Sequence, residues 1–135
     1  MYKHIVVAVD LAHGEAGKAL LDKAMALADA GGTIRLVHVL EDVPSYIAAE
    51  LPRDLNDRRN AEAKVELKLL ADAVPAESGL SFDTEIRNGA AAGQILQSAE
   101  DNGADLIMIA SHRPGLSDYF IGSTAARVVR PAPCS

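Results

Sequence analysis

The sequence predicts an α/β domain in which a doubly wound parallel sheet is covered by helices on both faces. The chain has 135 residues, of which 49% are hydrophobic, which is enough for one core and too little for two ordinary domains. Short apolar runs alternate with segments of helical periodicity. Each strand-to-strand connection is long enough to hold the crossover helix that parallel pairing requires. We therefore expect a single domain over residues 1–135.

The first strand–helix unit is expected at the N-terminus. A β-branched apolar run over residues 3–9 ends at Asp10 and indicates a buried strand. Residues 15–30 then repeat apolar side chains at helical spacing. We expect Gly31 and Gly32 to stop this helix.

The second unit combines a strand over residues 33–40 with a helix over residues 55–74, which Pro75 ends. The connection over residues 41–56 is long, which is typical of functional loops. One side of the helix is charged, and we assign its apolar face to Ala61, Val65 and Leu69.

The second half of the chain predicts two further strands around one helix. Residues 80–87 alternate apolar and polar side chains, which favours an exposed strand at the edge of the sheet. Residues 90–102 predict a helix that Gly103 caps, and residues 105–110 form an apolar fourth strand. The residues expected to face inward from the helix are Ile95, Leu96 and Ala99.

Composition excludes several classes of protein. The net charge of −6 and the isoelectric point near 5.1 argue against a nucleic-acid partner. No segment resembles a signal peptide or a membrane span, so we expect a cytoplasmic protein without a membrane partner. Cys134 is the single cysteine and excludes an internal disulfide. The histidines show no metal-ligand spacing, so we predict no metal site built from protein side chains.

Ligand-binding residues are expected beyond the carboxyl ends of the strands, because ligands bind there in open parallel sheets. Three of these ends carry suitable residues: Asp10 with Leu11, Val39 with Leu40, and residues 110–113. Taken as a bare residue, Asp10 is more often a turn or cap carboxylate, and a buried strand residue is the alternative interpretation of Val39.

The strongest local signal follows the fourth strand. Gly122 permits a close backbone approach, and Ser123 and Thr124 begin the last helix, whose N-terminus favours an anion. An ordinary serine N-cap is the alternative interpretation. Within the same loop, Arg113 supplies a cation and Gly115 supplies backbone freedom. His112 is either a phosphate contact or a solvated side chain.

Four stretches, IVVAVD, LVHVL, NGAAAGQIL and DLIMIASHRPGLSDYFIGSTAARVVRPAPCS, together resemble the universal stress protein family, specifically its nucleotide-binding branch. The resemblance implies ATP, with Mg²⁺, as ligand. It implies that Asp10 contacts the nucleotide, that the Val39 backbone meets adenine, and that the loop from Ala110 to Thr124 cradles the phosphates.

The chain departs from the family pattern at three places. Ala110 and Arg113 stand where the family signature has glycines, and eight residues separate Arg113 from Gly122 where the signature has nine. The sequence also ends at Ser135, before the final strand that the family uses for dimerisation. We still expect a homodimer.

The expected function is that of an ATP-binding module in the stress response, whose nucleotide regulates dimer shape or contacts with protein partners. No nucleophile elbow and no Walker-type phosphate loop is present, so we expect at most slow ATP hydrolysis. The alternative is a family member without nucleotide that acts only through protein–protein contacts.

Overall fold

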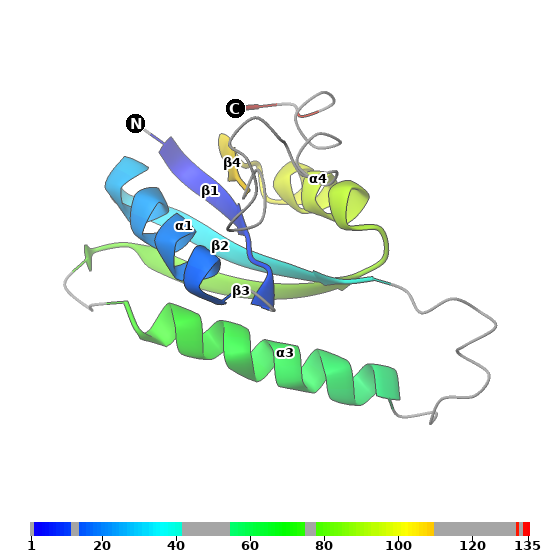
Figure 1. The fold of residues 1–135 in the computed structure, drawn as a ribbon. Coiled ribbons are helices and arrows are strands. Elements are labelled where there is room, and N and C mark those ends of the chain that lie inside the picture. The colour runs from blue at the N-terminus through cyan, green and yellow to red at the C-terminus, as the bar shows by residue number, and fades with distance from the viewer. Residues whose placement is uncertain (1, 12–13, 42–54, 75–77, 110–131, 133) are drawn as a thin grey trace, which may run out of the picture.

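A computed structural model describes residues 2–11, 14–41, 55–74, 78–109, 132 and 134–135. Its sheet has four parallel strands in the order β3-β2-β1-β4, and helices lie between them along the chain (Figure 1). This arrangement confirms the predicted parallel α/β fold. The elements are β1 (Tyr2–Ala8), α1 (Gly14–Leu27), β2 (Ala28–Leu40), α3 (Leu55–Asp72), β3 (Ser81–Asn88), α4 (Ala91–Asp101) and β4 (Leu106–Met108).

Helices cover the two faces of the sheet, and each face has its own core. Side chains of successive strand residues alternate between the faces. Ile5 and Val7 of β1 therefore pack on the α1 and α3 face, whereas Val6 packs against Ala99 of α4 on the other face. In Figure 1, α1 and α3 lie on one side of the strands and α4 lies on the other. The described part of the chain thus forms helix, sheet and helix layers.

The predicted end of the first helix is wrong. Helix α1 ends at Leu27, and the Gly31–Gly32 pair lies inside β2. The pairing of β1 with β2 shifts its register between Tyr2 and His4, and Gly31 has φ +77° within that irregularity. A Cβ atom on Gly32 would lie 3.2 Å from the Lys3 carbonyl oxygen. The glycines therefore allow an irregular, close strand pairing and do not terminate a helix.

The predicted apolar face of the second helix is also wrong. Val65 and Leu69 are 61% and 65% exposed, whereas Ala63 and Leu67 of the same helix are buried. The buried residues occupy the opposite side of α3, where alanine and leucine are separated by charged neighbours. Several apolar residues point outward here, so periodicity alone selected the wrong row.

Two other predictions about the second half of the chain are confirmed, whereas Leu96, expected to face inward with Ile95 and Ala99, is only partly buried and Ser98 is buried instead. Strand β3 lies at the edge of the sheet, and Gly103 follows α4 with φ +62°. At the other edge, the Ile107 N–H donates a hydrogen bond of 2.7 Å to the Ser135 carbonyl oxygen. The end of the chain therefore contacts β4 at Ile107. None of the helices in the described ranges is long and apolar enough to cross a membrane.

Candidate functional site

The crevice expected in this fold lies at the carboxyl ends of β1 and β4. The chain moves from β1 to β2 on one side and later places β4 on the other side of β1. The direction of winding reverses at this boundary, and ligands of open α/β sheets bind beyond the strand ends at such a position. Ile5 pairs with Leu106 and Val7 with Met108, so Asp10 follows β1 at the end where β4 also finishes. Asp10 is exposed there.

Strand β2 extends past its neighbour β1 at this end of the sheet. The last β1–β2 pair joins Ala8 to Val37, and the Val9 N–H donates a hydrogen bond of 2.8 Å to the Val37 carbonyl oxygen. The Leu40 carbonyl points toward β3 and accepts a hydrogen bond of 3.0 Å from the N–H of Gly89, which directly follows β3. Because backbone groups alternate along a parallel strand, those of Val39 point to the β1 side, as do those of Val37.

The structure therefore brings two predicted site residues to one place. Asp10 and Val39 each lie two residues beyond the last β1–β2 pair, one on each strand. The other predicted residues lie outside the described part of the chain: Ala110, His112, Arg113, Gly115, Gly122, Ser123 and Thr124.

His38 is a residue of this end of the sheet that sequence analysis missed. Its Nδ1 lies 2.8 Å from the Val9 carbonyl oxygen. A carbonyl oxygen only accepts, so Nδ1 carries the hydrogen. The histidine thereby fixes the end of β1 immediately before Asp10. No sequence pattern singles out His38, because it lies within a predicted strand and has no metal-ligand spacing to another histidine.

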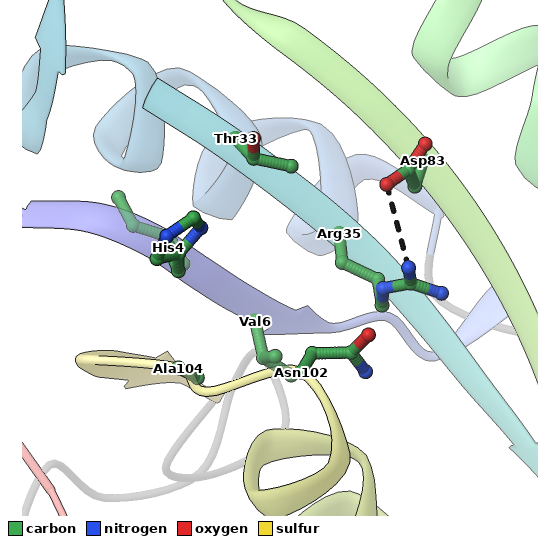
Figure 2. Close-up of a pocket in the computed structure, with 8 residues that line it drawn as sticks. His4, Val6, Thr33, Arg35, Asp83, Asn102 and Ala104 are labelled. Atoms are coloured by element: carbon green, nitrogen blue, oxygen red, sulfur yellow. Dashed lines mark hydrogen bonds and ion pairs between the residues drawn. The ribbon is translucent and has the colours of Figure 1, made fainter. Parts of the chain in front are cut away.

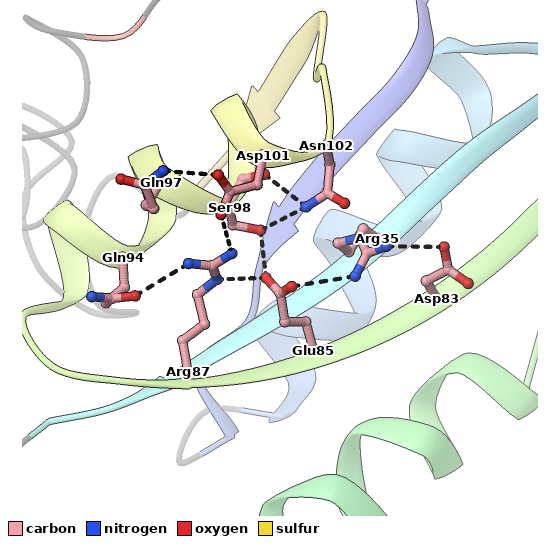
Figure 3. Close-up of polar contacts among 9 residues, drawn as sticks. All are labelled: Arg35, Asp83, Glu85, Arg87, Gln94, Gln97, Ser98, Asp101 and Asn102. Carbon is pink, nitrogen blue, oxygen red and sulfur yellow. Dashed lines mark hydrogen bonds and ion pairs between the residues drawn. The ribbon is translucent and has the colours of Figure 1, made fainter.

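A polar cluster joins β3 to α4 on the α4 face of the sheet (Figure 3). The Glu85 carboxylate accepts hydrogen bonds of 2.6 Å from both Arg87 Nε and Ser98 Oγ. Arg87 also donates to Asp101 of α4 at 2.9 Å. Partial burial acts to raise the pKa of Glu85, but the two hydrogen bonds and nearby arginine charges outweigh it and lower that pKa below 4.5. The cluster is thus an ion-pair network that stays charged at neutral pH and anchors α4.

A separate pocket of about 220 Å³ lies near the amino ends of the strands (Figure 2). Its lining includes His4, Thr33 and Asn102 together with the Arg35–Asp83 ion pair, whose atoms are 3.4 Å apart. The Arg35 guanidinium is already shared between Asp83 and Glu85. This pocket is at the opposite end of the sheet from Asp10 and is distinct from the crevice.

Among the described residues, neither a cluster of metal-ligating side chains nor an activated thiol is found. The described residues include no group of three or more histidine, cysteine, aspartate or glutamate side chains that could hold a metal ion. Cys134 is partly buried, and burial, together with the charge of Asp105, raises the pKa of its thiol. A thiolate nucleophile is therefore disfavoured at this cysteine.

Comparison with known proteins identifies the family. Residues 1–135 match the profile of the Universal stress protein family. The chain is 30% identical to universal stress protein G of Shigella flexneri over 98% of its own length and 94% of that protein. It is 32% identical to universal stress protein A homolog 2 of Coxiella burnetii, over 98% and 91% of the two chains.

Solved structures share the fold. Hypothetical protein MJ0577 superposes with a TM-score of 0.82 at 24% identity, covering 99% of this chain and 92% of that one. A universal stress protein in complex with cAMP superposes with a TM-score of 0.60 at 20% identity, over 99% and 93% of the two chains. The matched profile and the relatives cover almost the whole sequence, and this chain belongs to the universal stress protein family.

Proposed function

We propose that this universal stress protein binds an adenine nucleotide, with ATP and Mg²⁺ as the physiological ligand, in the crevice between the ends of β1 and β4. The observation that carries the proposal is the position of Val39, whose backbone N–H and C=O point past the end of β1. Adenine offers a ring nitrogen acceptor beside an exocyclic amine donor. Val39 presents the complementary donor and acceptor, and Asp10 lies level with it at the end of the neighbouring strand.

The phosphates would extend from this point toward the loop that follows β4. The sequence has Arg113, Gly122, Ser123 and Thr124 in that segment, where a cation, a permissive glycine and the N–H groups of the predicted last helix would suit a triphosphate. Mg²⁺ prefers phosphate oxygens and water to an all-protein cage, so a site without a dedicated set of side-chain ligands is compatible with Mg-ATP. A relative solved in complex with cAMP supports an adenine ligand for this fold.

The nucleotide would act as a regulatory ligand. It changes the shape of a homodimer, or the contacts with a protein partner, if it binds one conformational state better than the other. A protein without nucleotide that acts only through protein contacts is the second candidate, and exposed Val65 and Leu69 on α3 favour it as an apolar contact surface.

The first test is the nucleotide content of the purified protein. The protein is denatured and removed, and the supernatant is analysed by absorbance and chromatography. We expect adenine nucleotide, or binding of added Mg-ATP by calorimetry to protein that was emptied first. Asp10→Ala and Gly122→Val should each weaken that binding by at least tenfold. A protein that is empty and binds no added Mg-ATP would support the second candidate.

The base preference is a further outcome of the same calorimetry. Guanine carries a ring N–H donor and a carbonyl acceptor where adenine carries an acceptor and a donor. The Val39 N–H would then face a donor and the Val39 carbonyl an acceptor. Mg-ATP should therefore bind at least tenfold more tightly than Mg-GTP, because a mismatched polar group in a site costs more than 1.4 kcal/mol. Equal affinities would argue against recognition through Val39.

A further inference from the structure

The hydrogen-bond ladder between β1 and β2 lacks one further bond that the strand geometry would allow. Val9 donates its N–H to the Val37 carbonyl oxygen, as a ladder residue does. In a parallel ladder the Val9 carbonyl would next accept a hydrogen bond from the Val39 N–H. The described backbone hydrogen bonds include none between these two groups. The Val9 carbonyl instead accepts a hydrogen bond of 2.8 Å from His38 Nδ1.

We infer that His38 is a positioning residue that holds the Val39 N–H available for the ligand. The imidazole bonds to the backbone acceptor that lies opposite this N–H, and in the structure that carbonyl is bonded to the ring and not to the Val39 N–H. The inference rests on the proposed nucleotide site, because it explains why Val39 can serve that site. It also assigns a role to a side chain that does not itself touch the ligand.

The residue type suits this role. A partly buried backbone carbonyl needs a donor, and leaving it unpaired is costly. His38 meets that need from its own strand, next to Val39, because its ring reaches back to the end of β1. Without the ring, the nearest donor that the ladder geometry offers is the Val39 N–H. A hydrogen bond between the Val39 N–H and the Val9 carbonyl would then make that N–H unavailable to adenine.

Two substitutions at this position separate positioning from general stability. His38→Leu keeps an apolar side chain and removes the donor. His38→Asn keeps an amide donor near the position of Nδ1. We expect His38→Leu to weaken Mg-ATP binding by about tenfold, the loss of roughly one hydrogen bond, and His38→Asn to stay within about threefold of the wild type. Equal weakening by both variants, or by neither, would overturn the inference.

Amide hydrogen exchange of Val39 tests the inference without nucleotide. In the empty wild-type protein this amide should exchange at least tenfold faster than that of Val37, which lies inside the ladder, and Mg-ATP should slow it. In empty His38→Leu it should exchange slowly, because the ladder has closed. Slow exchange of Val39 in the empty wild type would overturn the inference even if the leucine variant failed to fold.

The two proposals can fail separately. If the wild-type protein binds no nucleotide, the proposed function fails, and with it the assigned purpose of the open ladder. If it binds Mg-ATP while Val39 is protected before binding, the nucleotide site stands and the role of His38 is rejected.

Discussion

The Ser98 hydroxyl of α4 donates a 2.6 Å hydrogen bond to the Glu85 carboxylate of β3. Ser98 is completely buried and is the only buried polar residue among those the structure describes. Helix α4 is therefore attached to the sheet by a charge-assisted hydrogen bond as well as by the apolar contacts of Val6, Val37 and Ala99.

Replacing Ser98 by alanine should lower the free energy of unfolding by about 1.5–3 kcal/mol, because a buried hydrogen bond to a charged group is lost. Urea denaturation measures this change. The matched control is Gln97→Ala on the same helix, whose side chain is exposed and donates to Asp101. That change should stay within about 0.5 kcal/mol. Equal effects of the two substitutions would contradict the assigned role of the Ser98–Glu85 bond.

Helix α3 offers a direct comparison of a buried and an exposed apolar residue. Leu67 has no exposed surface, and Val65 is 61% exposed. Leu67→Ala should therefore cost about 2–5 kcal/mol of stability, whereas Val65→Ala should change it by less than about 0.5 kcal/mol. Thermal or chemical unfolding distinguishes the two. A larger loss from Val65→Ala would mean that α3 uses the face that periodicity had indicated.

The fold class and the order of elements could be predicted from the sequence, because they depend on long, redundant patterns of apolar residues. The inward face of α3 could not, since Ala61, Val65 and Leu69 form as good an apolar row as the residues that the sheet actually buries. The glycine pair in β2 was misassigned for a related reason. A helix stop and an irregular strand have the same local signal, and only the pairing partner decides between them.

Glycine substitutions test that reassignment. A Cβ atom on Gly32 would come within 2.9 Å of the Asp29 carbonyl oxygen, whereas one on Gly93 of α4 would meet no atom within 4 Å. Gly32→Ala should destabilise the protein by about 1–3 kcal/mol. Gly93→Ala should stabilise it by up to about 1 kcal/mol, because alanine favours a helix. If Gly32→Ala is neutral in a denaturation experiment, the close strand approach is wrong.

Acid stability should depend on Asp105, which ties the start of β4 to β1. Its carboxylate accepts the Lys3 and His4 N–H groups at 2.8 and 3.0 Å. Partial burial acts to raise the pKa of Asp105, but these hydrogen bonds outweigh it and lower that pKa below 3.8. The folded state therefore binds this proton less tightly than the unfolded chain. The resulting stabilisation is present above pH 3.8 and is lost as the pH falls through the lower folded value.

Asp105→Asn should accordingly reduce stability at pH 7, and its difference from the wild type should shrink as the pH falls below about 4. Urea unfolding at several pH values measures this dependence. Asp72→Asn, at an exposed position on α3, is the control and should show no such trend. A wild-type advantage that stays constant down to the lowest pH would contradict the ionised role of Asp105.

Two residues of the candidate site could be predicted from the sequence, and a third could not. The strand-end rule and the family resemblance selected Asp10 and Val39, and the structure brings both to the end of the sheet where the winding reverses. His38 could not be found in this way. Its contribution depends on where β1 stops relative to β2, and that is a property of three-dimensional pairing which no local motif encodes.

The most direct test of the account is an amide chemical-shift titration of the protein with Mg-ATP. We expect the largest changes at Asp10, Val39 and Leu40, at the carboxyl ends of β1 and β2. The amides of His4, Arg35 and Asp83, at the pocket near the amino ends of the strands, should change little. Saturable changes centred on that pocket, or no changes at Asp10 and Val39, would contradict a nucleotide site in the crevice.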